Sequence, residues 1–165
     1  MLERVQRTHD EFAEVYEREY SRLARACLLL TGNASEAEDI AQEAFLRVYA
    51  RWEAVRAMDS PEGYLYRTAL NLHRKRLRRL AVRARHRFET VAERGGIDAI
   101  DERLDALRAV ASLPRGQREA LIMVEWLDLD MDEAAAILGI ATTSVRGRLH
   151  RARRTLRDRY GGDDE

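Results

Sequence analysis

The chain has 165 residues, of which 45% are hydrophobic and 35% charged, and its formal net charge is zero. This length allows one ordinary domain or two small ones, and the hydrophobic fraction is typical of a folded protein. No apolar run is long enough for membrane insertion, and the charged N-terminal stretch differs from a secretory signal. Because the single cysteine, Cys27, cannot form an internal disulfide, we expect a cytoplasmic protein.

Charged residues are segregated along the chain although their total is balanced. Residues 61–94 carry 10 basic and 3 acidic side chains, and residues 144–165 carry 7 and 4. The segments before them are acidic, with 8 basic and 12 acidic side chains over residues 1–60 and 4 and 10 over residues 95–143. A single basic segment is usually a solvated helix face. Two basic segments, each following an acidic segment, indicate two separate contacts with a polyanion.

The first half of the chain has the spacing of three amphipathic helices. Apolar residues over 12–30 recur at three- and four-residue steps, and the Thr-Gly-Asn sequence at 31–33 ends this helix. Ser35 and Glu38 have the spacing of a capping box, which predicts the start of a second helix. Ser60-Pro61 starts the third helix, which we expect to bury Leu65, Ala69 and Leu72 and then to turn basic through Arg85.

Helical periodicity is lost after the third helix and resumes near residue 104. Gly95-Gly96 and an acidic patch lie between, which predicts a flexible linker over residues 86–103. No strand pattern is present. We therefore predict an all-α fold of two small helical domains, 1–85 and 104–165, joined by the linker.

The second domain ends in a helix-turn-helix pattern. Asp130 and Glu133 form a capping box for a short helix, Gly139 supplies the turn, and a longer basic helix follows. In such motifs the second helix enters the major groove, where arginine pairs with guanine or binds phosphate. The alternative is an ordinary helical hairpin with a solvated basic face. The candidate readers, opposite or beside the apolar stripe, are Thr143, Ser144, Arg146, Gly147, His150 and Arg151.

The second helix has an acidic stripe on the side away from its apolar face. Its members, at helical spacings of three and four, are Asp39, Gln42, Glu43 and Leu46. A leucine exposed among polar groups indicates a partner surface, or it is one of the lone apolar residues common on protein surfaces.

The third helix has a basic stripe opposite its apolar face. Its members are Arg67, Asn71, Arg74, Lys75 and Arg78. Arginines would hold phosphates, and the asparagine amide can donate to and accept from a base. The nearby Trp52, Tyr64 and Tyr66 either stack on unpaired bases or belong to the core.

Three strings together resemble a known family. EDIAQEAFLR at 38–47, YLYR at 64–67 with Asn71 after it, and SVRGRLHRAR at 144–153 resemble a sigma-70-family factor. The similarity is to the small extracytoplasmic-function type, which keeps only regions 2 and 4, and the arginine-rich, lysine-poor composition resembles its actinobacterial members. The match covers nearly the whole chain in the same order.

The resemblance implies a transcription initiation factor that binds core RNA polymerase and promoter DNA. The acidic stripe would bind the clamp helices of the beta-prime subunit, with further contacts to the beta subunit. The third helix, with Asn71 and a loop over residues 54–60, would melt the minus-ten element and flip a non-template base, and the helix-turn-helix would read the minus-thirty-five element. An anti-sigma partner is common in the family, but no residue here identifies one.

Catalytic chemistry of its own is not expected. The four histidines lack cysteine or carboxylate companions at metal-binding spacing, so we predict no cofactor and no enzyme. Two other functions stay open. A dimeric helix-turn-helix regulator would bind duplex promoter without polymerase and leaves the acidic stripe unexplained. A sigma-like decoy for an anti-sigma protein should have lost the arginines of the last helix, which are intact.

Overall fold

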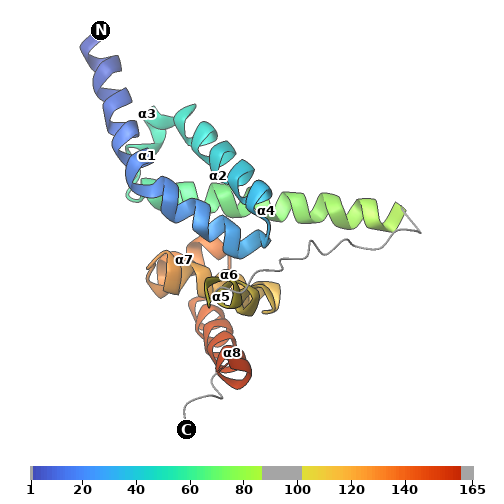
Figure 1. Ribbon diagram of the computed structural model, residues 1–165. Coiled ribbons are helices and arrows are strands. Elements are labelled where there is room, and N and C mark those ends of the chain that lie inside the picture. Colours follow the sequence, from blue (N-terminus) through green and yellow to red (C-terminus); the bar gives the residue numbers. More distant parts are fainter. Residues whose placement is uncertain (1, 87–101, 161–165) are drawn as a thin grey trace.

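A computed structural model of the chain describes residues 2–86 and 102–160, and every regular element within them is a helix. The helices form two groups that pack against each other (Figure 1). The first group contains α1 (Leu2–Thr31), α2 (Ala34–Tyr49), α3 (Trp52–Val55) and α4 (Pro61–His86); the second contains α5 (Glu102–Ala111), α6 (Arg115–Leu121), the π-helical turn η1 (Ile122–Trp126), α7 (Met131–Leu138) and α8 (Thr142–Tyr160). The all-α prediction is confirmed.

The predicted linker falls mostly outside the described part of the chain. Residues 87–101 lie outside it, and the ends of the 86–103 segment belong to α4 and α5. The exact domain limits stay a prediction.

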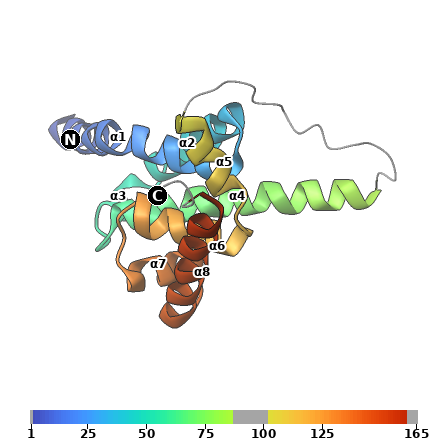
Figure 2. The same cartoon turned by 60° about the horizontal axis from the view of Figure 1, so that its bottom comes forward.

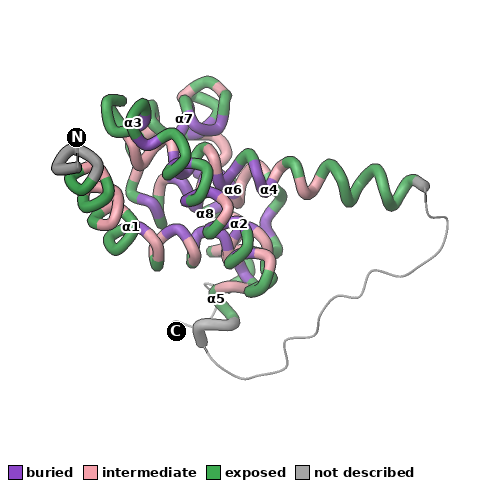
Figure 3. The backbone as a smooth tube through the Cα atoms, turned by 90° about the horizontal axis from the view of Figure 1, so that it is seen from above, coloured by how far each residue is buried: buried purple, intermediate pink, exposed green. Residues whose placement is uncertain are grey.

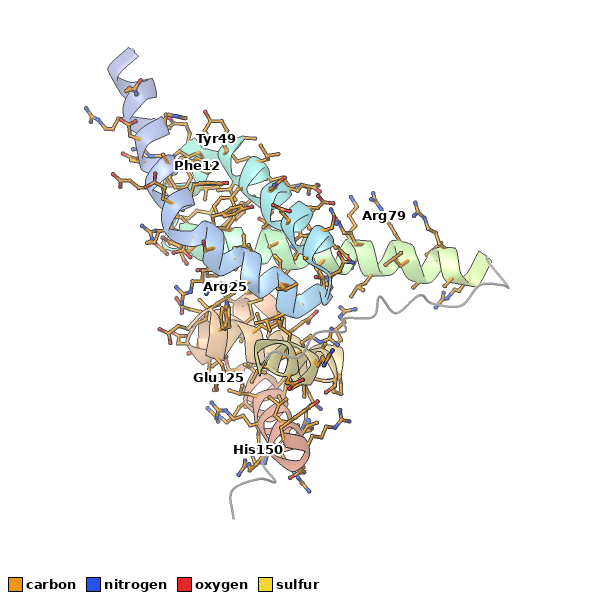
Figure 4. All side chains as sticks on the ribbon, viewed as in Figure 1. Phe12, Arg25, Tyr49, Arg79, Glu125 and His150 are labelled. Atoms are coloured by element: carbon orange, nitrogen blue, oxygen red, sulfur yellow. The ribbon has the colours of Figure 1, made fainter. Side chains whose placement is uncertain are left out.

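Aromatic rings pack α1 onto α2 and α3. The ring of Phe12 lies 4.8 Å from that of Tyr49 and 5.4 Å from that of Trp52, between centroids, and Figure 4 shows Phe12 and Tyr49 facing each other. Such tilted and edge-to-face pairs stabilise a core beyond the apolar area that they bury. Trp52 and Tyr66 are both buried. These two rings are therefore core residues and are not available to stack on bases.

The start of α2 differs from the capping box predicted at Ser35. The N-cap is Asn33, whose side-chain oxygen accepts the backbone N–H of Glu36 at 2.9 Å. Thr31 in turn accepts the backbone N–H of Asn33 through its hydroxyl. Asparagine caps as well as serine does, and Asn33 adopts the extended backbone that an N-cap needs.

Helix α4 begins as predicted at the Ser-Pro pair, and Ser60 Oγ accepts the backbone N–H of Gly63. Its buried face packs on α1 and α2 through Leu65, Ala69 and Leu72. From residue 78 to residue 85 every side chain is exposed, so the C-terminal third of α4 extends away from the body of the molecule (Figure 3).

The loop expected over residues 54–60 is shorter than predicted. Ala54 and Val55 belong to α3, and Val55 is fully buried. The exposed segment between α3 and α4 is residues 56–60.

The helix-turn-helix is confirmed in detail. Asp130 and Glu133 make the reciprocal capping box at the start of α7, and Gly139 ends α7 with φ of 70°, a left-handed conformation that glycine adopts without a steric penalty. Val145, Leu149 and Ala152 of α8 are buried. One local feature was not predicted: after Leu121 the chain continues from α6 into the wider helical turn η1.

Within residues 2–86 and 102–160, no helix combines the length and apolar character that a membrane span needs. The same residues contain no group of three or more histidine, cysteine or acidic side chains arranged to hold a metal ion.

Candidate nucleic-acid and partner interfaces

The acidic stripe on α2 lies on the surface. Leu46 is 68% exposed, the side chain of Asp39 is 64% exposed, and Gln42 is exposed as well. Ala37, Ile40 and Ala44 on the opposite face are buried. The structure therefore brings the four predicted residues together on one accessible face.

Two arginines contact the carboxylates of this stripe. Arg76 of α4 lies 3.9 Å from both Asp39 and Glu43, and Arg47 pairs with Glu43 at 2.5 Å. Ion pairs with this much solvent contribute little stability, at most about 1 kcal/mol each. The stripe can therefore exchange these partners for others.

The basic stripe on α4 divides into two parts. Asn71, Lys75 and Arg78 are exposed. Arg67, which is also exposed, and Arg74, which is partly buried, donate hydrogen bonds to the second helix group. Arg67 Nη2 donates to the carbonyl of Ala136 at 2.8 Å, and Arg74 Nη1 donates to that of Leu138 at 3.3 Å. Helix α7 packs against α4 (Figure 2). Arg67 and Arg74 therefore lie within reach of carbonyl groups of α7.

A buried carboxylate on α6 completes the contact. Glu119 is 2% exposed, and its two oxygens accept hydrogen bonds from Arg74 at 3.1 and 2.7 Å and from Arg115 at 3.1 Å. Burial raises the pKa of Glu119, but the hydrogen bonds and positive charge of the two arginines outweigh it and lower the pKa overall. Glu119 is therefore held as an anion at the junction of the two groups.

Within residues 2–86 and 102–160, no hydrogen bond or ion pair joins the outward face of α8 to the first group. Thr143, Ser144, Arg146, His150 and Arg151 are exposed, and Gly147 is half-buried. His150 lies where α8 extends away from α1–α4 (Figure 4). The guanidinium of Arg151 lies beside Gly147, so that a Cβ atom at that glycine would be 3.5 Å from Arg151 Nη1. The candidate readers thus share one solvent-facing surface.

Sequence reasoning missed the residues that join the two groups. Arg118 donates to the carbonyls of Leu30, Ala111 and Leu113, so one side chain ties α1 to the end of α5. The spacing of Arg115 and Glu119 could have indicated the ion pair on α6, since oppositely charged residues four apart on a helix lie side by side.

Comparison with known families gives two matches. The model of Sigma-70 region 2 matches residues 15–89, and that of Sigma-70, region 4 matches residues 103–156. The first match covers most of the α1–α4 group, and the second covers most of α5–α8.

Curated relatives are similar over most of the chain. The ECF RNA polymerase sigma factor SigE of Mycolicibacterium smegmatis is 34% identical over 157 residues, which cover 88% of this chain and 60% of that protein. The ECF RNA polymerase sigma factor EcfG of Rhodopseudomonas palustris is 33% identical over 131 residues, 77% of this chain and 72% of that protein. The chain thus spans three fifths of the first relative and almost three quarters of the second.

Solved structures share the fold. The sigma factor RpoE from Bartonella quintana, in complex with the anti-sigma factor NepR, gives a TM-score of 0.79 at 22% identity, over 93% of this chain and 99% of that one. CnrH in complex with the cytosolic domain of CnrY gives 0.68 at 23% identity, over 94% and 91%. Both likenesses extend over the two helix groups.

Proposed function

Because this chain belongs to the sigma-70 family, we propose that it is an extracytoplasmic-function sigma factor, which binds core RNA polymerase and directs transcription initiation at specific promoters. The observation that carries the proposal is the order of the exposed charged surfaces along the chain, compared with the order of the two matched family regions. An acidic, leucine-containing face and a basic helix lie in the segment that matches region 2, and an exposed helix-turn-helix lies in the segment that matches region 4. The cytoplasm, where polymerase works, is the expected compartment.

The α2 face is the proposed dock on polymerase, at the clamp helices of the beta-prime subunit. Asp39, Gln42 and Glu43 offer acceptors and charge, and Leu46 offers an apolar anchor exposed in the free chain. Exposed apolar side chains ringed by polar groups are typical of interfaces.

The α8 face is the proposed reader of the minus-thirty-five element. Arg146 and Arg151 are exposed, and neither side chain is needed by the helix core. A helix of this kind places such side chains against base edges in the major groove.

The start of α4 and residues 56–60 form the proposed reader of the melted minus-ten element. Asn71 is exposed between Arg67 and Arg74, so phosphates of one strand would lie on either side of a base held at Asn71. We also propose an anti-sigma protein as a partner, since the RpoE and CnrH structures above each contain a bound regulator.

Run-off transcription with purified core polymerase tests the function. Core alone, core with this chain, and core with a chain lacking residues 102–165 would be compared on a set of promoter fragments. We expect promoter-dependent transcripts only with the intact chain. Duplex promoter binding without polymerase, and no stimulated transcript on any fragment, would favour the helix-turn-helix regulator instead.

A further inference from the structure

A glycine lies in the middle of the outward face of α8. The residues three and four positions away from Gly147 on either side are Thr143, Ser144, His150 and Arg151, and all four are exposed. On a helix, residues at these spacings are the nearest neighbours on the surface. Gly147 is therefore surrounded by the candidate readers and carries no side chain of its own.

The fold does not require a glycine at this position. Inside a helix, glycine is the least favourable residue apart from proline. Gly147 has a right-handed helical backbone, unlike Gly139, whose φ is positive. A Cβ atom added to Gly116 of α6 would lie only 3.0 Å from the Arg148 side chain, whereas a Cβ atom on Gly147 would meet nothing closer than 3.5 Å. Packing within the chain thus explains Gly116 and leaves Gly147 unexplained.

The guanidinium of Arg151 occupies the surface that Gly147 leaves open. Its Nη1, Nη2 and Cζ atoms lie 3.5, 3.8 and 3.9 Å from the place that a Cβ atom would take. Side chains on a helix point toward its N-terminus, so that each one covers the turn before its own. Gly147 therefore lets this guanidinium lie close to the helix and nearer to the N-terminal part, which contacts base edges in helix-turn-helix proteins.

The hydrogen-bond donors of Arg151 are not used within the described part of the chain, residues 2–86 and 102–160. Other arginines of α8 do have partners there: Arg153 pairs with Glu125, Arg154 pairs with Asp158, and Arg159 donates to Ser112. A guanidinium that packs against the helix with free donors can bind the two acceptors of a guanine, and it loses little conformational freedom when it binds.

We propose that Gly147 is a specificity-determining residue of the α8 reader, because its missing side chain positions Arg151 to bind a guanine of the minus-thirty-five element. This inference rests on the proposed function, since it requires that α8 reads promoter DNA. Gly147 acts through Arg151 and is a positioning residue. An alanine at 147 is tolerated, because its Cβ makes an ordinary van der Waals contact at 3.5 Å. A longer side chain reaches into the space of the guanidinium and displaces it.

The test compares holoenzymes that contain the parent chain, G147A, G147L, G147Q or R151A. Each selects promoter fragments from a library randomised over the minus-thirty-five element, and sequencing of the bound fragments gives the base preference at each position. We expect R151A, G147L and G147Q to lose preference for guanine at the same base pair, by about tenfold or more. G147A is the matched control and should keep this preference.

Urea denaturation of the free chains checks that the fold is intact. All three replacements of Gly147 should raise the urea midpoint, because alanine, leucine and glutamine favour a helix more than glycine does. A loss of base preference in a variant that is more stable than the parent cannot be caused by unfolding.

The double variant R151A/G147L distinguishes the positioning of Arg151 from simple steric exclusion of DNA. We expect it to bind the library as R151A does, because the leucine then has no guanidinium to displace. A further loss over all sequences would show that Gly147 makes room for the DNA itself, and would overturn the proposal. It would also be overturned if G147L and G147Q kept the guanine preference, or if R151A did not change it.

Run-off transcription with the parent chain tests the proposed function separately. If the parent directs promoter-dependent transcription while G147L and G147Q keep the guanine preference, only the positioning role of Gly147 is wrong. If the parent stimulates no transcript on any fragment, both the proposed function and this inference are wrong.

Discussion

Tyr66 and Glu19 form a buried polar pair between α4 and α1. The hydroxyl of Tyr66 donates to Glu19 Oε2 at 2.6 Å, and both residues are almost fully buried. Burial raises the pKa of Tyr66, and the hydrogen bond to the carboxylate raises it further, so the phenol stays protonated as the donor. Arg18 contacts the other oxygen of Glu19.

Tyr66→Phe should therefore destabilise the fold. The substitution keeps the ring but leaves one oxygen of a buried carboxylate without its donor, which costs about 1–3 kcal/mol. Urea denaturation followed by circular dichroism would measure the free energy of unfolding. Tyr64→Phe is the control, since Tyr64 contacts Arg51 at the surface. Equal losses in the two variants would contradict the role given to the pair.

His73 makes the stability of the chain depend on pH. Burial lowers the pKa of His73 below 6.5, and the positive charges of Arg115, Arg118 and Arg74 lower it further, against an opposite effect of Glu119. Its Nδ1 has no hydrogen-bond partner within the described part of the chain. The fold therefore holds this imidazole neutral.

A group whose pKa is lowered by folding contributes stability above its unfolded pKa, and that stability is lost as the pH falls. The free energy of unfolding should thus decrease as the pH falls from about 7.5 to about 5.5, and His73→Gln should flatten the decrease. Glu119, also of lowered pKa, acts in the same direction at lower pH. Denaturation midpoints measured across this pH range report the effect. If the midpoint changes with pH equally in the parent and in His73→Gln, groups other than His73 cause the dependence.

At the scale of single helices, α2 separates its two faces cleanly. Charge reversal of Asp39 and Glu43 together should weaken binding to core polymerase by about tenfold or more while leaving the helices intact, because both carboxylates lie away from the core. Co-purification and circular dichroism would measure the two effects. Glu38→Lys, an exposed change on the same helix outside the stripe, is the control. Unchanged binding by the double variant would show that the polymerase-binding surface lies elsewhere on the chain.

Helix α8 supports a test of base reading. Arg151→Ala should cost about 1–3 kcal/mol in promoter binding by the holoenzyme and relax the preference at one base pair. Arg157→Ala, exposed nearer the end of the same helix, is the control for lost charge. A uniform loss over all promoter sequences would show that Arg151 holds phosphate only.

Local sequence patterns predicted these elements well because local physics determines them. The capping box at Asp130 and Glu133 and the glycine turn at Gly139 depend on neighbours within four residues, and the structure has them as predicted. At the start of α2, two side chains that lie two residues apart could both cap the helix, and the pattern selected Ser35 where the chain uses Asn33. The π-helical turn has no local signal of its own in the sequence.

At the scale of the whole molecule, the sequence could not predict which surfaces would be covered. The spacing of Arg67 and Arg74 placed both on one face of α4, and the structure agrees. Their partners lie 45 to 69 residues away along the chain, on helices whose docking depends on shape as well as charge. The roles of the individual site residues stay predictions for the experiments above.

The burial of the Arg74–Glu119 pair has a consequence for how the chain responds to ionic strength. Mobile ions screen exposed charges over roughly 10 Å at 0.1 M, but they act weakly on a pair enclosed by protein, and Glu119 is enclosed. Contacts between arginines and DNA weaken steeply with salt, because each one releases condensed counterions. Raising the salt concentration should therefore weaken DNA binding while leaving the packing of the two helix groups intact, so the radius of gyration of the free chain should stay constant over the range in which its DNA affinity falls.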